Sequence, residues 1–187
     1  MAIWQFPIYF IPKQSLFEKY GCLPPQLEMD KDGWSKYLAN AAFEKEPESK
    51  DALAVQWWLP LNIDISTLLP ILRQFGDLQE WTAHLEGLRS FGDSEANDVC
   101  VCFRPDTGKV EEFSCRLDLR QVNKDFVGRL LSFAVHYDCL FMDRIGRIYN
   151  PTHESLIRAI ELSNTKRFVE DPKQFLKDLS QGIAKPE

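Results

Sequence analysis

Residues 98–120, DVCVCFRPDTGKVEEFSCRLDLR, constrain the fold more than any other part of the chain. Apolar and polar residues alternate on both sides of PDTG, a pattern typical of two antiparallel strands joined by a turn. The return strand should have one buried face, with Phe113, Cys115, Leu117 and Leu119, and one opposite face, with Glu112, Ser114, Arg116, Asp118 and Arg120. The chain therefore has to build part of an antiparallel sheet.

A long amphipathic helix follows this hairpin. Asn123 is a favourable N-cap, and the apolar residues between it and Tyr137 recur at helical spacing. The main stripe comprises Phe126, Leu130, Phe133, Ala134 and Tyr137, with Val127, Leu131 and Val135 beside it. We expect Leu117, Leu130, Leu131 and Phe133 to lie in the core, because one side of such a helix has to be covered by the sheet.

The remaining elements are predicted from local signals. We expect a strand over 2–11 ended by Pro12, a helix capped by Asp64 or Ser66 with Pro70 near its first turn, a strand over 78–88, a loop over 89–98, a hairpin bending at Gly146, and helices starting after Thr152 and after Asp171. The region 12–60 is expected to be irregular and rich in loops. Within it, WSKYLANAAF could form a short helix or an irregular segment.

This order of elements predicts the fold class. A chain of 187 residues suits one domain, so residues 1–187 are expected to form a single unit. Consecutive strands without regular crossover helices favour an antiparallel sheet. We therefore expect an α+β fold in which a mainly antiparallel sheet packs against the long helix, with short helices at the C-terminal end.

Composition excludes several classes of protein. The formal net charge of −6 opposes binding to nucleic acid and favours a basic partner, although mild acidity also serves solubility. No run of about 20 apolar residues predicts a membrane span, and Gln5, Pro7 and Pro12 interrupt the opening too often for a signal peptide. The five cysteines fit neither a compact disulfide framework nor a zinc ribbon, so we expect reduced thiols and a cytoplasmic location.

Candidate catalytic residues are few. His84, His136 and His153 lie too far apart in the sequence to form a metal clamp, so neither a metal nor another cofactor is expected. Cys139 with His136 and Asp143 could form a nucleophile, a base and an orienting carboxylate. The stronger interpretation is that Cys139 is a small apolar residue in a buried strand. The sequence contains no nucleophile elbow, phosphate-binding glycine loop or dinucleotide fingerprint.

Arg116, Asp118 and Arg120 are the candidate binding residues, because they recur at every second position of the return strand. Side chains two apart on one face lie about 7 Å from one another, which allows both arginines to reach the aspartate. The ordered charges could recognise a carboxylate or a basic group of a partner protein, or tie the strand to region 12–60. They could also be the solvated side of the strand, with weak ion pairs.

The second half of the chain resembles small uncharacterised bacterial proteins encoded beside polymorphic toxins, which are of the immunity type. The resemblance rests on DVCVCF through RLDLR, the following helix, DCLFMDRIGRIYNPT and SNTKRFVEDPKQFL. It implies a cytosolic, non-enzymatic protein that binds a protein partner, and it assigns no functional residue. The alternatives are a small hydrolase or transferase with a site near His136 and Cys139, and a regulatory domain that binds a small ligand.

Overall fold

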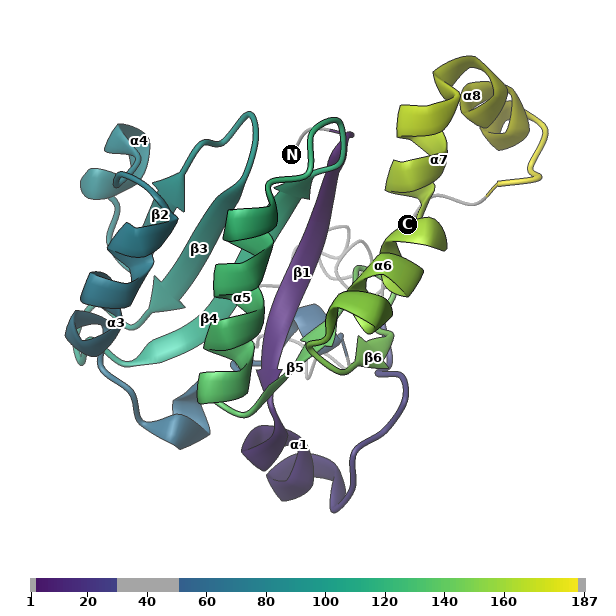
Figure 1. Cartoon of the computed structure of the whole chain (residues 1–187). Helices are drawn as coiled ribbons and strands as arrows, with labels where there is room; N and C mark the ends of the chain where they lie inside the picture. Colours follow the sequence, from purple (N-terminus) through teal and green to yellow (C-terminus); the bar gives the residue numbers. More distant parts are fainter. Residues whose placement is uncertain (1–2, 30–50, 185–187) are drawn as a thin grey trace, which may run out of the picture.

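A computed structural model gives the structure of the chain and describes residues 3–29 and 51–184. Six strands form one antiparallel sheet in the order β2-β3-β4-β1-β5-β6. The strands are β1 (Gln5–Pro12), β2 (Leu88–Gly92), β3 (Asp98–Phe103), β4 (Val110–Asp118), β5 (Cys139–Met142) and β6 (Ile148–Tyr149). The helices are α1 (Lys13–Tyr20), α3 (Ile65–Leu72), α4 (Glu80–Ala83), α5 (Lys124–His136), α6 (His153–Glu161), α7 (Asn164–Glu170) and α8 (Pro172–Ser180) (Figure 1). Short 3-10 turns η1 (Ala52–Ala54), η2 (Leu59–Leu61) and η3 (Arg73–Phe75) complete the described part. The α+β prediction is confirmed.

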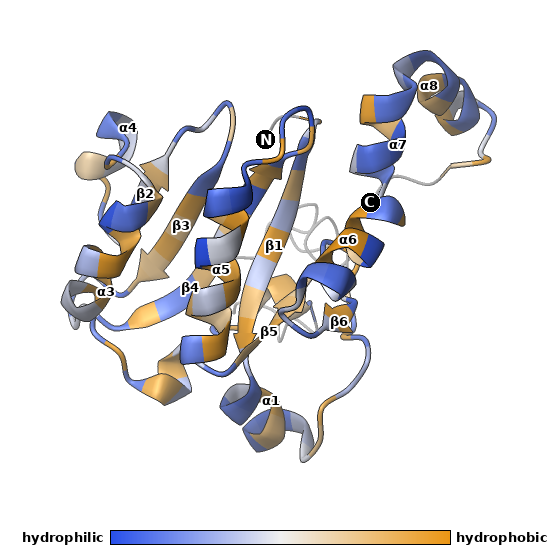
Figure 2. Cartoon of the chain, in the orientation of Figure 1, coloured by the Kyte–Doolittle hydropathy of each residue, from blue (hydrophilic) through white to orange (hydrophobic). Residues whose placement is uncertain are grey.

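The long helix α5 covers one face of the sheet. Hydrophobic and hydrophilic residues alternate along it, as expected for a helix with one buried side (Figure 2). Phe133 of α5 stacks on Phe113 of β4 with ring centres 4.2 Å apart, and Phe10 of β1 meets both rings edge-on. The four residues expected in the core, Leu117, Leu130, Leu131 and Phe133, are all buried.

Strand β1 holds the two halves of the sheet together. Its first part pairs with β4 as far as Tyr9, and from Tyr9 onward it pairs with β5. Trp58 fills the space where β1 and β4 separate: its indole N–H donates to the Phe10 carbonyl at 2.8 Å, and its backbone N–H donates to the Glu111 carbonyl. A fully buried tryptophan thus completes the sheet where strand pairing stops.

Two neighbouring segments differ from the sequence prediction. The range 78–88, predicted as a strand, contains helix α4 instead, and the predicted loop 89–98 contains strand β2. Phe91 explains the second difference, because its buried side chain and its pairing with Val99 make residues 88–92 an outer strand. The preceding segment meets the outer edge of β2 in a bridge between Leu78 and Phe91, and α4 begins two residues later at Glu80.

Several helix boundaries are also informative. The predicted caps Asp64, Asn123, Thr152 and Asp171 each accept a hydrogen bond from a backbone N–H of the first turn. Pro70, expected near the first turn of α3, lies further inside that helix. Region 12–60 contains helix α1, whereas WSKYLANAAF lies outside the described residues.

Within residues 3–29 and 51–184, no helix combines the length and the apolar character needed to cross a membrane.

Candidate functional site

Arg116 pairs with Asp98 of the neighbouring strand. The two residues are directly opposite in the register of β3 and β4, and the guanidinium binds both carboxylate oxygens, with Nε donating to Oδ1 at 2.7 Å. Asp98 is fully buried and also accepts from Ser90 and Gln79. This pair stabilises the sheet, because without Arg116 the buried Asp98 carboxylate would have no cation beside it.

Asp118 and Arg120 make the contact that the alternation predicted. Arg120 Nη2 lies 2.8 Å from Asp118 Oδ2, and the same nitrogen donates to the Glu95 carbonyl. The Arg120 guanidinium also stands 4.3 Å from the Trp4 ring centre, a cation–π distance. Hydrogen bonding from Arg120 lowers the pKa of the Asp118 carboxyl.

The three residues therefore do not form one ladder of alternating charges. Arg116 and Arg120 have separate carboxylate partners, and Asp118 is buried rather than presented at the surface. Arg116 joins β4 to β3 through Asp98, and Arg120 joins the end of β4 to Glu95 in the loop after β2. Neither of these contacts ties the strand to the described part of region 12–60. Their hydrogen-bonding groups are largely occupied, so a partner would find fewer free donors here than the sequence suggested.

The residues of the candidate nucleophilic site are not brought together. Cys139 is buried at the start of β5, and burial raises the pKa of its thiol above the ordinary value. Asp143, beyond the other end of this strand, binds Arg147. His136 is exposed at the end of α5. In the described part of the chain, no three His, Cys, Asp or Glu side chains are grouped so as to hold a metal ion.

The face of the sheet opposite α5 carries several half-buried titratable groups. Burial raises the pKa of the Cys102 thiol to about 12 and that of the Tyr9 hydroxyl to about 12. Glu112, opposite Cys102 in the register, also has a raised pKa because burial disfavours its carboxylate. These thiol and phenol groups are therefore uncharged at neutral pH, which makes them poor nucleophiles.

The surface around α4 has a different character, because large apolar side chains are exposed on a fixed backbone. Leu78, Trp81 and Leu85 are 40%, 54% and 41% exposed. Beneath them, Thr82 is completely buried, and its hydroxyl accepts a hydrogen bond from the Ser90 backbone N–H of β2 at 3.1 Å. Trp81 is therefore displayed on a helix that is anchored to the sheet.

Arg89 fixes the other end of this short helix. Its guanidinium donates to the carbonyl groups of Thr82, Leu85 and Leu88, and it lies over the Phe103 ring. The Arg89 guanidinium therefore binds backbone carbonyl groups of this segment. The charged side chains within residues 77–88 are those of Asp77, Glu80 and Glu86. We call the exposed residues Asp77, Leu78, Glu80, Trp81, Leu85 and Glu86 the α4 surface.

Sequence reasoning missed the α4 surface, although it contains a usable signal. Leu78, Trp81 and Leu85 are separated by three and four residues, which is helical spacing. Interpreting the segment as a strand placed Trp81 and Leu85 on one side and Leu78 on the other. Helix α4 covers Glu80–Ala83, so Leu78 and Leu85 flank it, and all three side chains are exposed.

Comparison with known proteins identified no relative of the chain. No protein-family model matches the chain, and neither a curated protein nor a solved structure is significantly similar to it.

Proposed function

We propose that this chain is a cytosolic, non-enzymatic protein-binding domain of the immunity type, and that its partner is a basic protein. The exposed Trp81 on the anchored α4 surface is the observation that carries the proposal. Tryptophan is among the residues most enriched at the energetic centres of protein interfaces. A rigid support lowers the entropy that binding would otherwise cost.

Charge supports the choice of partner. The apolar centre of the α4 surface is accompanied by three carboxylates, and no Lys or Arg occurs between residues 77 and 88. An apolar centre with a charged rim is the usual anatomy of a transient interface. The acidic rim, together with the net charge of −6, would speed encounter with a basic partner.

The proposal is tested by replacing Trp81 with Ala. Affinity capture from an extract of the native cells, followed by mass spectrometry, identifies the partner of the parent chain. We expect Trp81→Ala to weaken binding of that partner by about 2 kcal/mol or more, the loss typical of an interface anchor. Thermal unfolding should be nearly unchanged, because the Trp81 side chain is more than half exposed.

Phe17→Ala is the matched control, because Phe17 is an aromatic residue of similar exposure, 51%, on α1. It should retain the partner. Reversal of charge, Glu80→Lys with Glu86→Lys, should slow association and reduce its dependence on salt. Equal capture by the parent and by Trp81→Ala, or an acidic partner, would contradict the proposal. An immunity role further requires that the captured protein be toxic to cells lacking this chain.

A further inference from the structure

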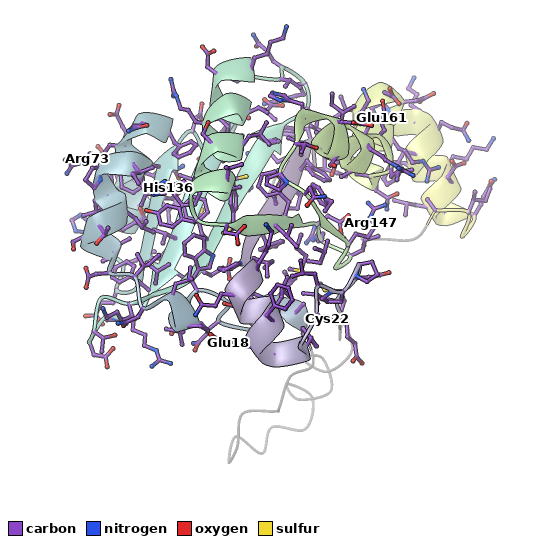
Figure 3. All side chains as sticks on the ribbon, turned by 60° about the horizontal axis from the view of Figure 1, so that its bottom comes forward. Glu18, Cys22, Arg73, His136, Arg147 and Glu161 are labelled. Atoms are coloured by element: carbon purple, nitrogen blue, oxygen red, sulfur yellow. The ribbon has the colours of Figure 1, made fainter. Side chains whose placement is uncertain are left out.

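A cleft separates α5 from the segment formed by α3 and η3, and nothing in the proposed interaction at the α4 surface uses it. Its volume is about 710 Å³, within the range typical of small-molecule sites. Asp125, Gly128, Arg129, Ser132 and His136 line one wall from successive turns of α5. Figure 3 shows His136 on the side of α5 toward the segment that carries Arg73.

Gly128 is an unfavourable choice for the middle of this helix. A glycine there costs about 0.5–1 kcal/mol relative to alanine, because the unfolded chain loses more conformational freedom. No tight packing requires it, since a Cβ added at Gly128 would meet no atom within 4 Å. The glycine instead leaves the α5 backbone open to the cleft, as is typical where a ligand approaches a backbone closely.

The two ends of the cleft have different chemistry. Lys124 and Arg129 line the end near the start of α5, and neither has a carboxylate within ion-pair distance among the described residues. Arg129 donates one N–H to the Gln74 carbonyl, and a guanidinium has four further N–H donors. His136 and Tyr137 line the other end, with ring centres 4.7 Å apart.

Asp125 is the one acidic residue among those that line the cleft. The two cations outnumber it, so the charged end favours an anion. By helix rise, Arg129 and His136 are separated by about 10 Å along α5. A ligand that uses both ends is therefore elongated, with its charge and its ring at opposite ends.

We propose that this cleft binds a small organic anion whose aromatic ring lies against His136 and Tyr137 and whose anionic group is held by Arg129 and Lys124. The middle of the ligand passes over Gly128. No residue that lines this cleft belongs to the α4 surface.

The probe is 6-phenylhexanoate, in which an alkyl chain separates a ring from a carboxylate. Isothermal titration with the full chain should give saturable binding. The neutral analogue 6-phenylhexanamide and the ringless hexanoate should each bind at least about tenfold more weakly, because each lacks one of the two recognised groups. Arg129→Gln should weaken 6-phenylhexanoate by a similar factor, and Asp125→Asn should strengthen it.

Gly128→Leu tests the path of the ligand, because its side chain would occupy the cleft. It should abolish binding while leaving the chain folded, since leucine favours helix over glycine. Arg158→Gln, at an exposed arginine of α6 away from the cleft, is the control and should bind normally. The absence of saturable binding, equal affinity for the acid and the amide, or full binding by a folded Gly128→Leu variant would each overturn the proposal.

Discussion

The ion pair between Arg116 and Asp98 joins strands β4 and β3, and its carboxylate is shielded from solvent. The Asp98 side chain is 0% exposed and that of Arg116 is 20% exposed. Arg116→Ala would leave the aspartate with neutral donors alone, and losing one partner of a buried pair usually costs about 3–5 kcal/mol. We expect a loss of this size in the free energy of unfolding measured with urea.

Arg120→Ala is the matched comparison for Arg116→Ala. Its side chain is 49% exposed, so water can replace much of what its guanidinium contributes to Asp118. We expect a much smaller loss of stability for Arg120→Ala than for Arg116→Ala. Similar losses for the two variants would show that burial of Asp98 does not control the difference.

Glu112 is the residue at which we expect pH to matter. Burial raises its pKa in the folded chain, so the stability associated with its protonated form is present below the unfolded pKa and is lost as the pH rises through the folded pKa. Glu112→Gln should therefore raise the free energy of unfolding at pH 7 by about 1 kcal/mol. The gain should disappear near pH 4, where the parent also carries a neutral side chain.

The control for this pH effect is Glu111→Gln on the same strand. Glu111 accepts from Arg104 at 2.9 Å, so replacing it removes an ion pair and should bring no gain at pH 7. Urea unfolding of both variants and the parent at pH 7 and pH 4 provides the measurement. A gain for Glu112→Gln that persisted at pH 4 would point to a cause other than ionisation.

At the scale of elements, α5 has a buried side and an exposed side. Substitutions of one apolar residue on each side allow the two sides to be compared. Leu131 is 8% exposed and Val135, one turn later, is 67% exposed. Leu131→Ala should cost about 2–5 kcal/mol through lost burial and the cavity left behind. Val135→Ala should change stability by less than about 0.5 kcal/mol. Comparable losses in the two denaturation curves would mean that the helix presents a different side to the sheet.

At the scale of the whole molecule, one core connects the sheet, α5 and the segment containing Trp57 and Trp58. These two of the five tryptophans are buried, so their share of the fluorescence reports on tertiary packing. We expect the fluorescence and far-ultraviolet circular dichroism transitions in urea to coincide, as for a two-state domain. Separate transitions would indicate that part of the helical structure unfolds independently of this core.

Local chemistry was enough to predict much of the fold. The hairpin around PDTG, the cap at Asn123 and the cap at Asp171 depend on residues close together in the chain, and the structure confirms all three. The alternation in β4 also placed Phe113 and Leu117 correctly in the core. These features are readable because strand and helix periods act within a few residues.

Tertiary structure decided the features that depend on contacts between distant residues. Nothing near Arg116 in the sequence identifies Asp98 as its partner, because strand register creates that pair. Likewise, residues 88–92 become a strand through pairing with β3, and Thr82 anchors α4 through Ser90. The sequence by itself determined an α+β chain with a long amphipathic helix. Packing determined which charged side chains form ion pairs within the sheet, and it left Trp81 exposed on the surface. Both outcomes depend on which segments meet in space.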